Sequence, residues 1–342
     1  MSDAAPAPRP PSRLWLILPF ALVGIVLVAF CAWWFVAANR LQAGIDEAAR
    51  AHREAGRTLE WRSRRVSGFP FRLKVTFEDL RFASPGGWAV QAPRLEAQAN
   101  AYRLTHWVGS APRGLTIVRP VAGAVRIDAR VLRASVSGAD QNPPRIAVEG
   151  VDLRFAPGPG AEPFAFAAAE RFELHLRAAS GAEEDAEFVV RLKQAAPRPA
   201  GLVSFVSAGR AADIVWDSRL TRFDAFKGRD WASAVAAWTE RGGHMQVNQA
   251  SFLAGDVSVR TRDARLSVGR DGRLRGRLDL ALNRPLQALT ALTQLDGASP
   301  DAAATAGAIA QARGANAALP LSFEAGVMTI GPVRLGDAPR VY

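Results

Sequence analysis

The strongest pattern in the chain is an uncharged apolar run over residues 14–38, "LWLILPFALVGIVLVAFCAWWFVAA". It is longer than the roughly 20 residues that cross the hydrocarbon core of a bilayer as a helix. Trp15 lies at its start and Trp33 and Trp34 near its end, as in the aromatic belts of the two membrane interfaces. The pattern predicts an uncleaved transmembrane anchor, preceded by a Pro-rich, disordered cytoplasmic tail over residues 1–13.

The orientation of this anchor depends on the domain that follows it. Arg9 and Arg13 precede the span and further arginines follow it, so the positive-inside rule does not choose between the two topologies. A long domain after the span crosses the membrane largely regardless of its charge. We therefore expect a single pass through a bacterial inner membrane, with a cytoplasmic N-terminus and a periplasmic body. A signal peptide cleaved at Ala38 is the alternative, although its apolar core spans only about 7–15 residues.

Residues 39–65 show a weaker apolar pattern with helical spacing. Steps of four and three residues separate its members, which therefore fall on one stripe of a helix. The stripe consists of Leu41, Ile45, Ala48, His52, Ala55 and Leu59. We expect a short helical stalk, and its stripe fits packing against the body as well as self-association.

The run "FRLKVTFEDLRF" (residues 71–82) alternates apolar and polar side chains, which is typical of a half-buried strand. Its apolar positions are odd-numbered up to Phe77 and even-numbered from Leu80, so the pattern slips at Glu78 and Asp79. A β-bulge at this point would return the apolar side chains to one face.

The same alternation recurs through the rest of the chain. It marks residues 123–138, 145–155, 171–178, 187–194 and 255–268. Hairpins are expected around Asp271-Gly272 and around Ala325-Gly326, with Pro332 on an edge strand.

Helical segments are few. The stretch from Phe223 to Gly243 predicts a helix with Trp231, Val235 and Trp238 on one face and a glycine pair at its end. Two further short helices are expected at residues 285–292 and 300–313, and two Pro- and Gly-rich loops at residues 156–163 and 194–201.

Many alternating strands imply one extensive dry face, which must be covered by a second sheet, by curling, by helices or by a ligand. We predict a mainly β body over residues 66–342, built as a long or curled antiparallel sheet, half-barrel or sandwich-like, with a few peripheral helices. Its interior is either a filled core or an apolar trough that holds acyl chains. Periodicity alone does not separate these two possibilities.

The composition adds a basic surface to this picture. Lys and Arg number 43 against 32 Asp and Glu, which gives a formal net charge of +11. Such a charge favours anionic lipid headgroups, at about 1 kcal/mol for each base near a membrane, although Arg- and Ala-rich usage is also typical of a GC-rich genome. No nucleic-acid-binding motif appears, so we expect no nucleic-acid partner.

The residue types of common catalytic and metal sites are scattered. His52, His106, His175 and His244 are the only histidines, and none has a metal-ligand spacing such as HExxH. Cys31, the only cysteine, lies inside the apolar span, so the body has no disulfide or thiolate site. Phosphate-loop and nucleophile-elbow motifs are missing as well. We expect a non-enzymatic protein without cofactor or metal.

One group of candidate residues is aromatic and lies around the helix predicted from Phe223. Its members are Phe223, Phe226, Trp231 and Trp238. They either pack the helix onto the dry face of the sheet or let it dip into a membrane or gate an apolar groove.

A second candidate group, Gly68-Phe69-Pro70-Phe71-Arg72, precedes the first clear strand. Pro70 fixes its own φ near −65° and favours an extended Phe69, while Gly68 permits a sharp exit from the stalk. Phe69 and Phe71 then bury aromatic area at the base of the sheet. We interpret the segment as the corner that docks the first strand to the stalk, and as a candidate lipid contact.

Three stretches taken together resemble a known family. They are "GFPFR" (residues 68–72), "WTERGGHMQVNQASFLAGDVSVRTRDARLSVGRDGRLRGRLDLAL" (residues 238–282) and "LPLSFEAGVMTIGPVRLGDAP" (residues 319–339). Their order after a single N-terminal span resembles the uncharacterised, membrane-anchored alphaproteobacterial envelope proteins called domain of unknown function 2125. More distantly, the chain is similar to the AsmA-like group of β-rich envelope proteins.

The AsmA-like group is associated with phospholipid transport or outer-membrane assembly, so this resemblance implies lipid handling by analogy. The chain is far shorter than the envelope-bridging members, which argues against a complete conduit. Our leading hypothesis is non-enzymatic binding of phospholipid or another anionic lipid in envelope biogenesis, with apolar strand residues lining the site and Arg near its mouth. The alternative is a scaffold with a filled core that docks other envelope proteins through sheet edges or the stalk.

Overall fold

A computed structural model describes most of the chain from Leu14 onward. The described residues are 14–139, 141–199, 201–228, 230–283, 316–331 and 333–342. Several predictions lie outside them: the tail over residues 1–13, the helices at 285–292 and 300–313, the side chain of Trp15, and Pro332.

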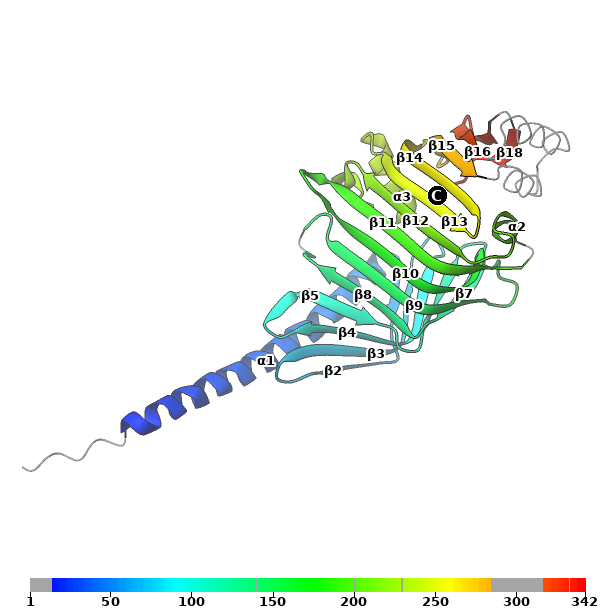
Figure 1. The fold of residues 1–342 in the computed structure, drawn as a ribbon. Helices are drawn as coiled ribbons and strands as arrows, with labels where there is room; N and C mark the ends of the chain where they lie inside the picture. The colour runs from blue at the N-terminus through cyan, green and yellow to red at the C-terminus, as the bar shows by residue number, and fades with distance from the viewer. Residues whose placement is uncertain (1–13, 140, 200, 229, 284–315, 332) are drawn as a thin grey trace, which may run out of the picture.

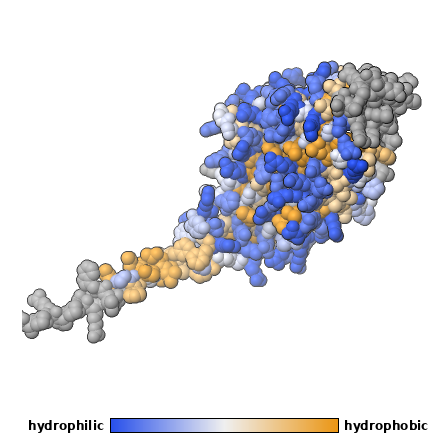
Figure 2. All heavy atoms as spheres, viewed as in Figure 1, coloured by the Kyte–Doolittle hydropathy of each residue, from blue (hydrophilic) through white to orange (hydrophobic). Residues whose placement is uncertain are grey.

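The N-terminal helix α1 (Leu14–Glu54) is continuous over 41 residues. From Leu18 onward it is long and apolar enough to cross a membrane, by length and composition, and its most apolar part is almost entirely exposed. This part projects from the body (Figure 1) as an apolar rod (Figure 2). The predicted N-terminal apolar helix is therefore present.

The stalk predicted over residues 39–65 is helical only as far as Glu54. Gly56, which follows the helix, has a φ of +72°, a conformation common for a glycine after a helix C-terminus. The chain then forms β1 (Thr58–Glu60) and β2 (Ser63–Ser67), which both pair with β3. The prediction is wrong for this last part because the pairing partner, which helical spacing does not reveal, decides its conformation.

The described residues form one antiparallel sheet of 18 strands (Figure 1). After β1 and β2 the strands are β3 (Arg72–Ala83), β4 (Ala89–Asn100), β5 (Arg103–Ser110), β6 (Leu115–Arg119), β7 (Gly123–Asp128), β8 (Val131–Ser137), β9 (Arg145–Pro157), β10 (Phe166–Ala179), β11 (Ala182–Pro197), β12 (Ala212–Leu220), β13 (Met245–Ala254), β14 (Val257–Val268), β15 (Leu274–Asn283), β16 (Asn316–Glu324), β17 (Val327–Ile330) and β18 (Val333–Asp337).

Most strands pair with their neighbours in the sequence. Strand β4 follows β3 and pairs with both β5 and β6. These two pair with β8 and β7, which in turn both pair with β9. From β9 to β18 each strand pairs with the next. The long sheet curls (Figure 1), and the predicted mainly β class is confirmed.

Within the described residues, three short helical segments interrupt the sheet: α2 (Leu202–Val206), the 3-10 turn η1 (Phe223–Ala225) and α3 (Trp231–Glu240). The helix predicted from Phe223 therefore begins only at Trp231. Asp230 stops it there, because its side chain accepts a hydrogen bond from the backbone N–H of Ser233 while the Ser233 hydroxyl accepts one from the backbone N–H of Asp230. Such a reciprocal cap fixes a helix start.

The predicted β-bulge at Glu78 and Asp79 does not form, because the pairing of β3 with β4 keeps one register along its length. Asp79 instead adopts a left-handed backbone conformation with a φ of +51°. Leu73 packs near Trp34 of α1, and Phe82 contacts His52 of α1 at 5.6 Å between ring centroids. Apolar side chains before and after the slip thus both face α1, as expected. The left-handed residue Asp79, rather than a β-bulge, returns them to one face.

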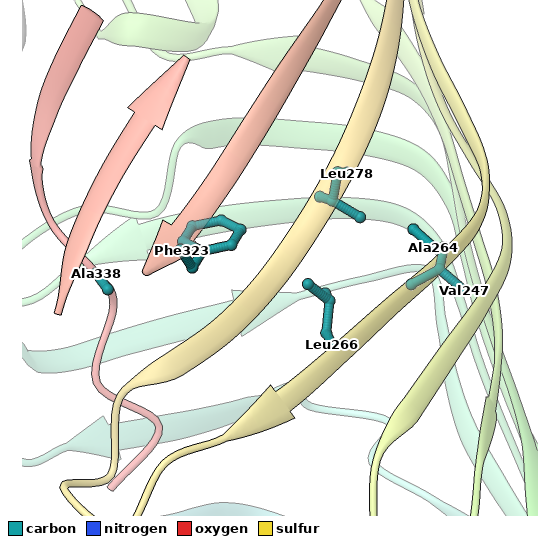
Figure 3. Close-up of a cluster of buried hydrophobic side chains, with 6 residues drawn as sticks. All are labelled: Val247, Ala264, Leu266, Leu278, Phe323 and Ala338. Atoms are coloured by element: carbon teal, nitrogen blue, oxygen red, sulfur yellow. The ribbon is translucent and has the colours of Figure 1, made fainter. Parts of the chain in front are cut away.

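The dry face of the sheet is filled in separate places. Around β13 to β16 one cluster joins Val247, Leu266, Leu278 and Phe323 with Ala338 (Figure 3). Further clusters fill the face around β7 to β11, beneath α1 and beneath α3. The interior is therefore a packed core in part, and the unfilled remainder defines the candidate site.

The opposite, wet face carries rows of paired charges. Glu149 lies between Arg133 and Arg171, and Arg171 also pairs with Glu173. On β3 and β4, Lys74 lies 2.7 Å from Glu96. The hydrogen bond from Lys74 holds the pKa of the Glu96 carboxyl below its ordinary value of 4.5. Much of the side of the body seen in Figure 2 is accordingly hydrophilic.

Candidate functional site

A pocket of about 390 Å³ lies on the dry face beneath η1 and α3. Its lining is apolar apart from Ser267. The sheet supplies the floor, including Ile146, Leu176 and Phe188, while the connection between β12 and β13 supplies the wall. The pocket is thus a continuation of the core that protein side chains leave unfilled.

The four aromatic residues predicted as a candidate group all line this pocket. Phe223 stacks on Phe226 at 5.6 Å between ring centroids, and Phe226 meets Trp231 at 5.4 Å and Trp238 at 6.4 Å. Trp238 is buried, and its indole Nε1–H donates to the backbone carbonyl of Thr221. The cluster therefore both packs α3 onto the sheet and forms one wall of the pocket.

An apolar row leads from the pocket across the sheet towards α1. Trp107, Val136, Ile146, Leu176 and Phe188 stand directly opposite one another on successive strands, from β5 through β8, β9 and β10 to β11. All five are half-buried. Four strand spacings place the two ends about 20 Å apart.

A second hollow, of about 480 Å³, lies between α1 and the end of this row at Trp107. Leu41 and Ile45 of α1 line it together with Leu73 and Trp107 of the sheet. Trp107 belongs to the row and Ile146 lines the first pocket, so only Val136 separates the two hollows along the row. The stripe predicted on the stalk thus packs, in part, against the body.

The predicted corner also lies at α1. Gly68 has a φ of +102°, and a Cβ there would lie 2.7 Å from the carbonyl oxygen of Arg72, so the sharp exit depends on glycine. The Phe69 ring stacks on Phe35 at 5.7 Å, and the Nε1–H of Trp34 donates to the backbone carbonyl of Arg72 at 2.9 Å. The corner docks the first long strand to α1 at the end of the apolar segment.

The expectation that the corner buries its aromatic rings at the base of the sheet is wrong. Phe69 is 48% exposed and Phe71 is 68% exposed, because both rings lie against the side of α1 rather than inside the sheet. The corner and the α3 aromatic cluster are therefore two separate places, at either end of the apolar row.

The model of a family described as an uncharacterized protein conserved in bacteria (DUF2125) matches residues 34–339. The chain belongs to the DUF2125 family. The match begins at Trp34, the first described residue of α1 that is buried against the body. No curated protein and no solved structure matches the chain. The likeness to AsmA-like proteins stays a prediction.

Charged residues of both signs surround α3 in this DUF2125 chain. Arg222, Lys227 and Arg241 flank η1 and α3, are exposed, and have no ion-pair partner among the described residues. Asp224, Asp230 and Glu240 lie on the same segments. The carboxylate of Asp185 also lies nearby, where it accepts a hydrogen bond from the backbone N–H of Arg222 and is 3.9 Å from Arg219. Exposed bases and carboxylates therefore lie together beside a pocket that is itself apolar.

The histidines of the DUF2125 chain occupy separate environments. His52 contacts Phe82, and His244 lies with its Nδ1 2.9 Å from the hydroxyl of Thr221. His106 and His175 line a shallow depression on the wet face. Within the described residues no three His, Cys, Asp or Glu side chains come together as metal ligands.

Sequence reasoning on this DUF2125 chain missed the sheet half of the site. Strand β5 ("RLTHWVGS") has Gly109 two residues after Trp107, so its alternation is weak. The paired row becomes visible only from the strand register. The signal that could have been used was Trp107 itself, the large aromatic side chain of this strand.

Proposed function

We propose that this protein is a non-enzymatic, membrane-anchored lipid-binding protein that holds an acyl chain in the pocket beneath α3. The observation that carries the proposal is the apolar pocket of about 390 Å³ that core side chains leave unfilled on the dry face. Protein interiors are normally packed to crystal density, and ligand pockets measure about 300–1,000 Å³.

The shape and charge of the surroundings support an amphiphilic ligand. The row from Phe188 to Trp107 extends the apolar surface beyond the pocket, as a long hydrocarbon chain requires. The exposed bases Arg222, Lys227 and Arg241 lie near α3 among carboxylates, where they are placed to contact an anionic headgroup. Phospholipid or another anionic lipid combines these two properties.

The proposed place of action is the bacterial envelope. We assign α1 as an uncleaved signal-anchor in the inner membrane, with the N-terminus in the cytoplasm and the body in the periplasm. The exposed apolar surface of α1 and membership of a family conserved in bacteria support this assignment. In this location the protein would take lipid from the membrane that holds it, as part of envelope biogenesis.

The test compares two neighbouring substitutions in the full chain. Leu176→Asn places an amide in the pocket floor, whereas His175→Asn changes the exposed side chain on the opposite face of the same strand. Trp238→Ala is a poor substitute, because it also removes buried packing and the hydrogen bond to Thr221. Both proteins are purified in detergent, and bound lipid is measured by native mass spectrometry and extraction.

We expect Leu176→Asn to retain lipid at least about tenfold more weakly than the original chain, because an apolar contact is replaced by an unpaired polar group. His175→Asn should retain lipid normally. Lipid that surrounds α1 is common to both variants and cancels in the comparison. Equal retention by folded Leu176→Asn would contradict the proposal and favour the alternative, a scaffold that binds other envelope proteins through its sheet edges or α1.

A further inference from the structure

We propose that the rim of the body around α1 is seated in the headgroup layer of the bilayer that α1 spans. The aromatic rim consists of Phe69, Phe71 and Tyr102. This inference rests on α1 as a membrane anchor, but not on a lipid in the pocket. It names the bilayer as the partner of the aromatic rim, whose exposure is not explained by contacts within the protein.

The first observation is the exposure of three large side chains at adjacent turns. Phe69 is 48% exposed, Phe71 is 68% exposed and Tyr102 is 77% exposed. The turns lie side by side, because Arg72 pairs with Asn100 at the start of β3 and the backbone N–H of Ala101 donates to the carbonyl of Phe71. Clustered exposed aromatic side chains mark an interaction surface.

The second observation is the level of this surface along α1. Phe69 contacts Phe35 at 5.7 Å, and Phe71 lies 6.5 Å from Phe30, between ring centroids. A span of about 20 residues covers the roughly 30 Å of hydrocarbon, so a span that begins near Leu14 ends close to these contacts. The rim therefore lies where α1 leaves the hydrocarbon, and aromatic side chains favour that interface.

The third observation is charge. Arg72 and Arg103 are exposed beside the rim and have no ion-pair partner among the described residues. On the wet face, by contrast, arginines such as Arg133 and Arg171 pair with Glu149. Free bases at the headgroup level fit anionic lipids.

Continuity with α1 selects lipid over protein as the occupant. The rim adjoins the exposed apolar surface of α1, which a bilayer covers. A second copy or another protein at the rim would have to share this space with the bilayer. The bilayer itself covers both α1 and the rim without a second protein.

The experiment measures depth in the membrane with a fluorescent label. Cys31 is the only cysteine, so Cys31→Ala gives a background in which single cysteines carry a nitrobenzoxadiazole label. Phe71→Cys and Tyr102→Cys report on the rim. Val121→Cys, a fully exposed apolar residue in the turn between β6 and β7 at the opposite end of β4, is the matched control. Leu22→Cys reports on α1.

The full chain is reconstituted in vesicles of phosphatidylethanolamine and phosphatidylglycerol that contain spin-labelled lipids. We expect shallow quenchers to remove most of the fluorescence at positions 71 and 102, deep quenchers to act at position 22, and neither to act at position 121. Replacing phosphatidylglycerol by phosphatidylcholine should weaken quenching at position 102, and Arg72→Gln with Arg103→Gln should remove that dependence on lipid charge.

Three results would overturn the inference, and they are distinguishable. If position 22 is quenched while positions 71 and 102 behave like position 121, α1 spans the membrane but the rim is not seated in it. If the label at position 102 is blue-shifted but unquenched, the rim is covered by protein, such as a second copy. Failure of quenching at position 22 would instead remove the membrane anchor itself, and with it the basis for the rim.

Discussion

Four residues inside strands of the described part of the chain adopt a left-handed backbone conformation. They are Asp79, Asp152, Gln194 and Asp263, with φ values between +47° and +54°. At each of them the apolar positions change parity, for example from Val259 before Asp263 to Leu266 after it. A single residue thus keeps the dry side chains on one face where strict alternation would turn them outward.

One of these four changes of parity could be predicted from the sequence, but its backbone conformation could not. The slip at Glu78 and Asp79 is visible in the pattern, but both a bulge and a left-handed residue restore the dry face. The choice depends on the partner strand, since β4 keeps one register past the slip. Asp is among the few side chains that tolerate this conformation.

The left-handed position of Asp263 makes a prediction for stability. We expect Asp263→Val to lower the free energy of unfolding by about 1–2 kcal/mol, because a β-branched side chain clashes with the backbone at positive φ. Asp263→Gly should leave it unchanged or raise it slightly. Urea unfolding of the detergent-solubilised protein measures both. Equal stability of the Val and Gly variants would show that the strand relaxes at this point.

At the scale of elements, α1 shows what hydropathy conceals. The pattern predicted a span followed by a separate stalk, yet one helix serves both roles and buries Trp34 and Ala38 against Leu73 and Ala101. Hydropathy measures how apolar a helix is but does not tell which apolar side chains face lipid and which face protein. Leu41 and Ile45 were identified from their spacing because polar residues surround them.

The paired strands β3 and β4 make a prediction for pH dependence. The folded-state pKa of Glu96 lies below its ordinary value of 4.5, chiefly through the hydrogen bond from Lys74. A depressed carboxyl pKa stabilises the fold above the unfolded pKa, and this contribution is lost as the pH falls through the folded pKa. Glu96→Gln should therefore lower stability by up to about 1 kcal/mol near neutral pH and have no effect once Glu96 is protonated.

Urea unfolding of the original chain and of Glu96→Gln across pH 3–7 measures this difference in the free energy of unfolding. Glu60→Gln is the control for net charge, because Glu60 is exposed and has no ion-pair partner among the described residues. A difference between Glu96→Gln and the original chain that stays constant with pH would contradict the assignment of the stabilisation to the Glu96 carboxylate.

At the scale of the whole molecule, the curled antiparallel sheet was predictable and its extent was not. Alternation shows that a strand is half-buried but does not show its partners. Strand β4 was missed because its buried side chains are Ala89, Ala92 and Ala99, which contrast weakly with polar neighbours. For the same reason the aromatic wall of the pocket was identified from the sequence, while the floor, which depends on the register of β9 to β11, was not.

The joint core of anchor and body predicts that the two unfold together. A chain that begins at Asn39 lacks Trp34 and Ala38, which are buried, and the hydrogen bond from Trp34 to Arg72. We expect it to be less stable than a chain that begins at Phe30, by about 3–5 kcal/mol if loss of Trp34 resembles a buried Trp→Ala change. Thermal unfolding followed by circular dichroism measures this, and identical midpoints would contradict a shared core.

The continuity of α1 also sets the reach of the protein. In the topology proposed above, α1 runs without a break from the membrane into the body, and the hydrogen bond from Trp34 fixes it to β3. No hinge then separates the described part of the helix in the membrane from the body. The body then has a fixed orientation relative to the membrane, and no part of it lies farther from the membrane than the length of the body itself. A lipid held as proposed above would therefore have to be collected by a second molecule that comes to the body, because no flexible segment separates α1 from the sheet within the described residues.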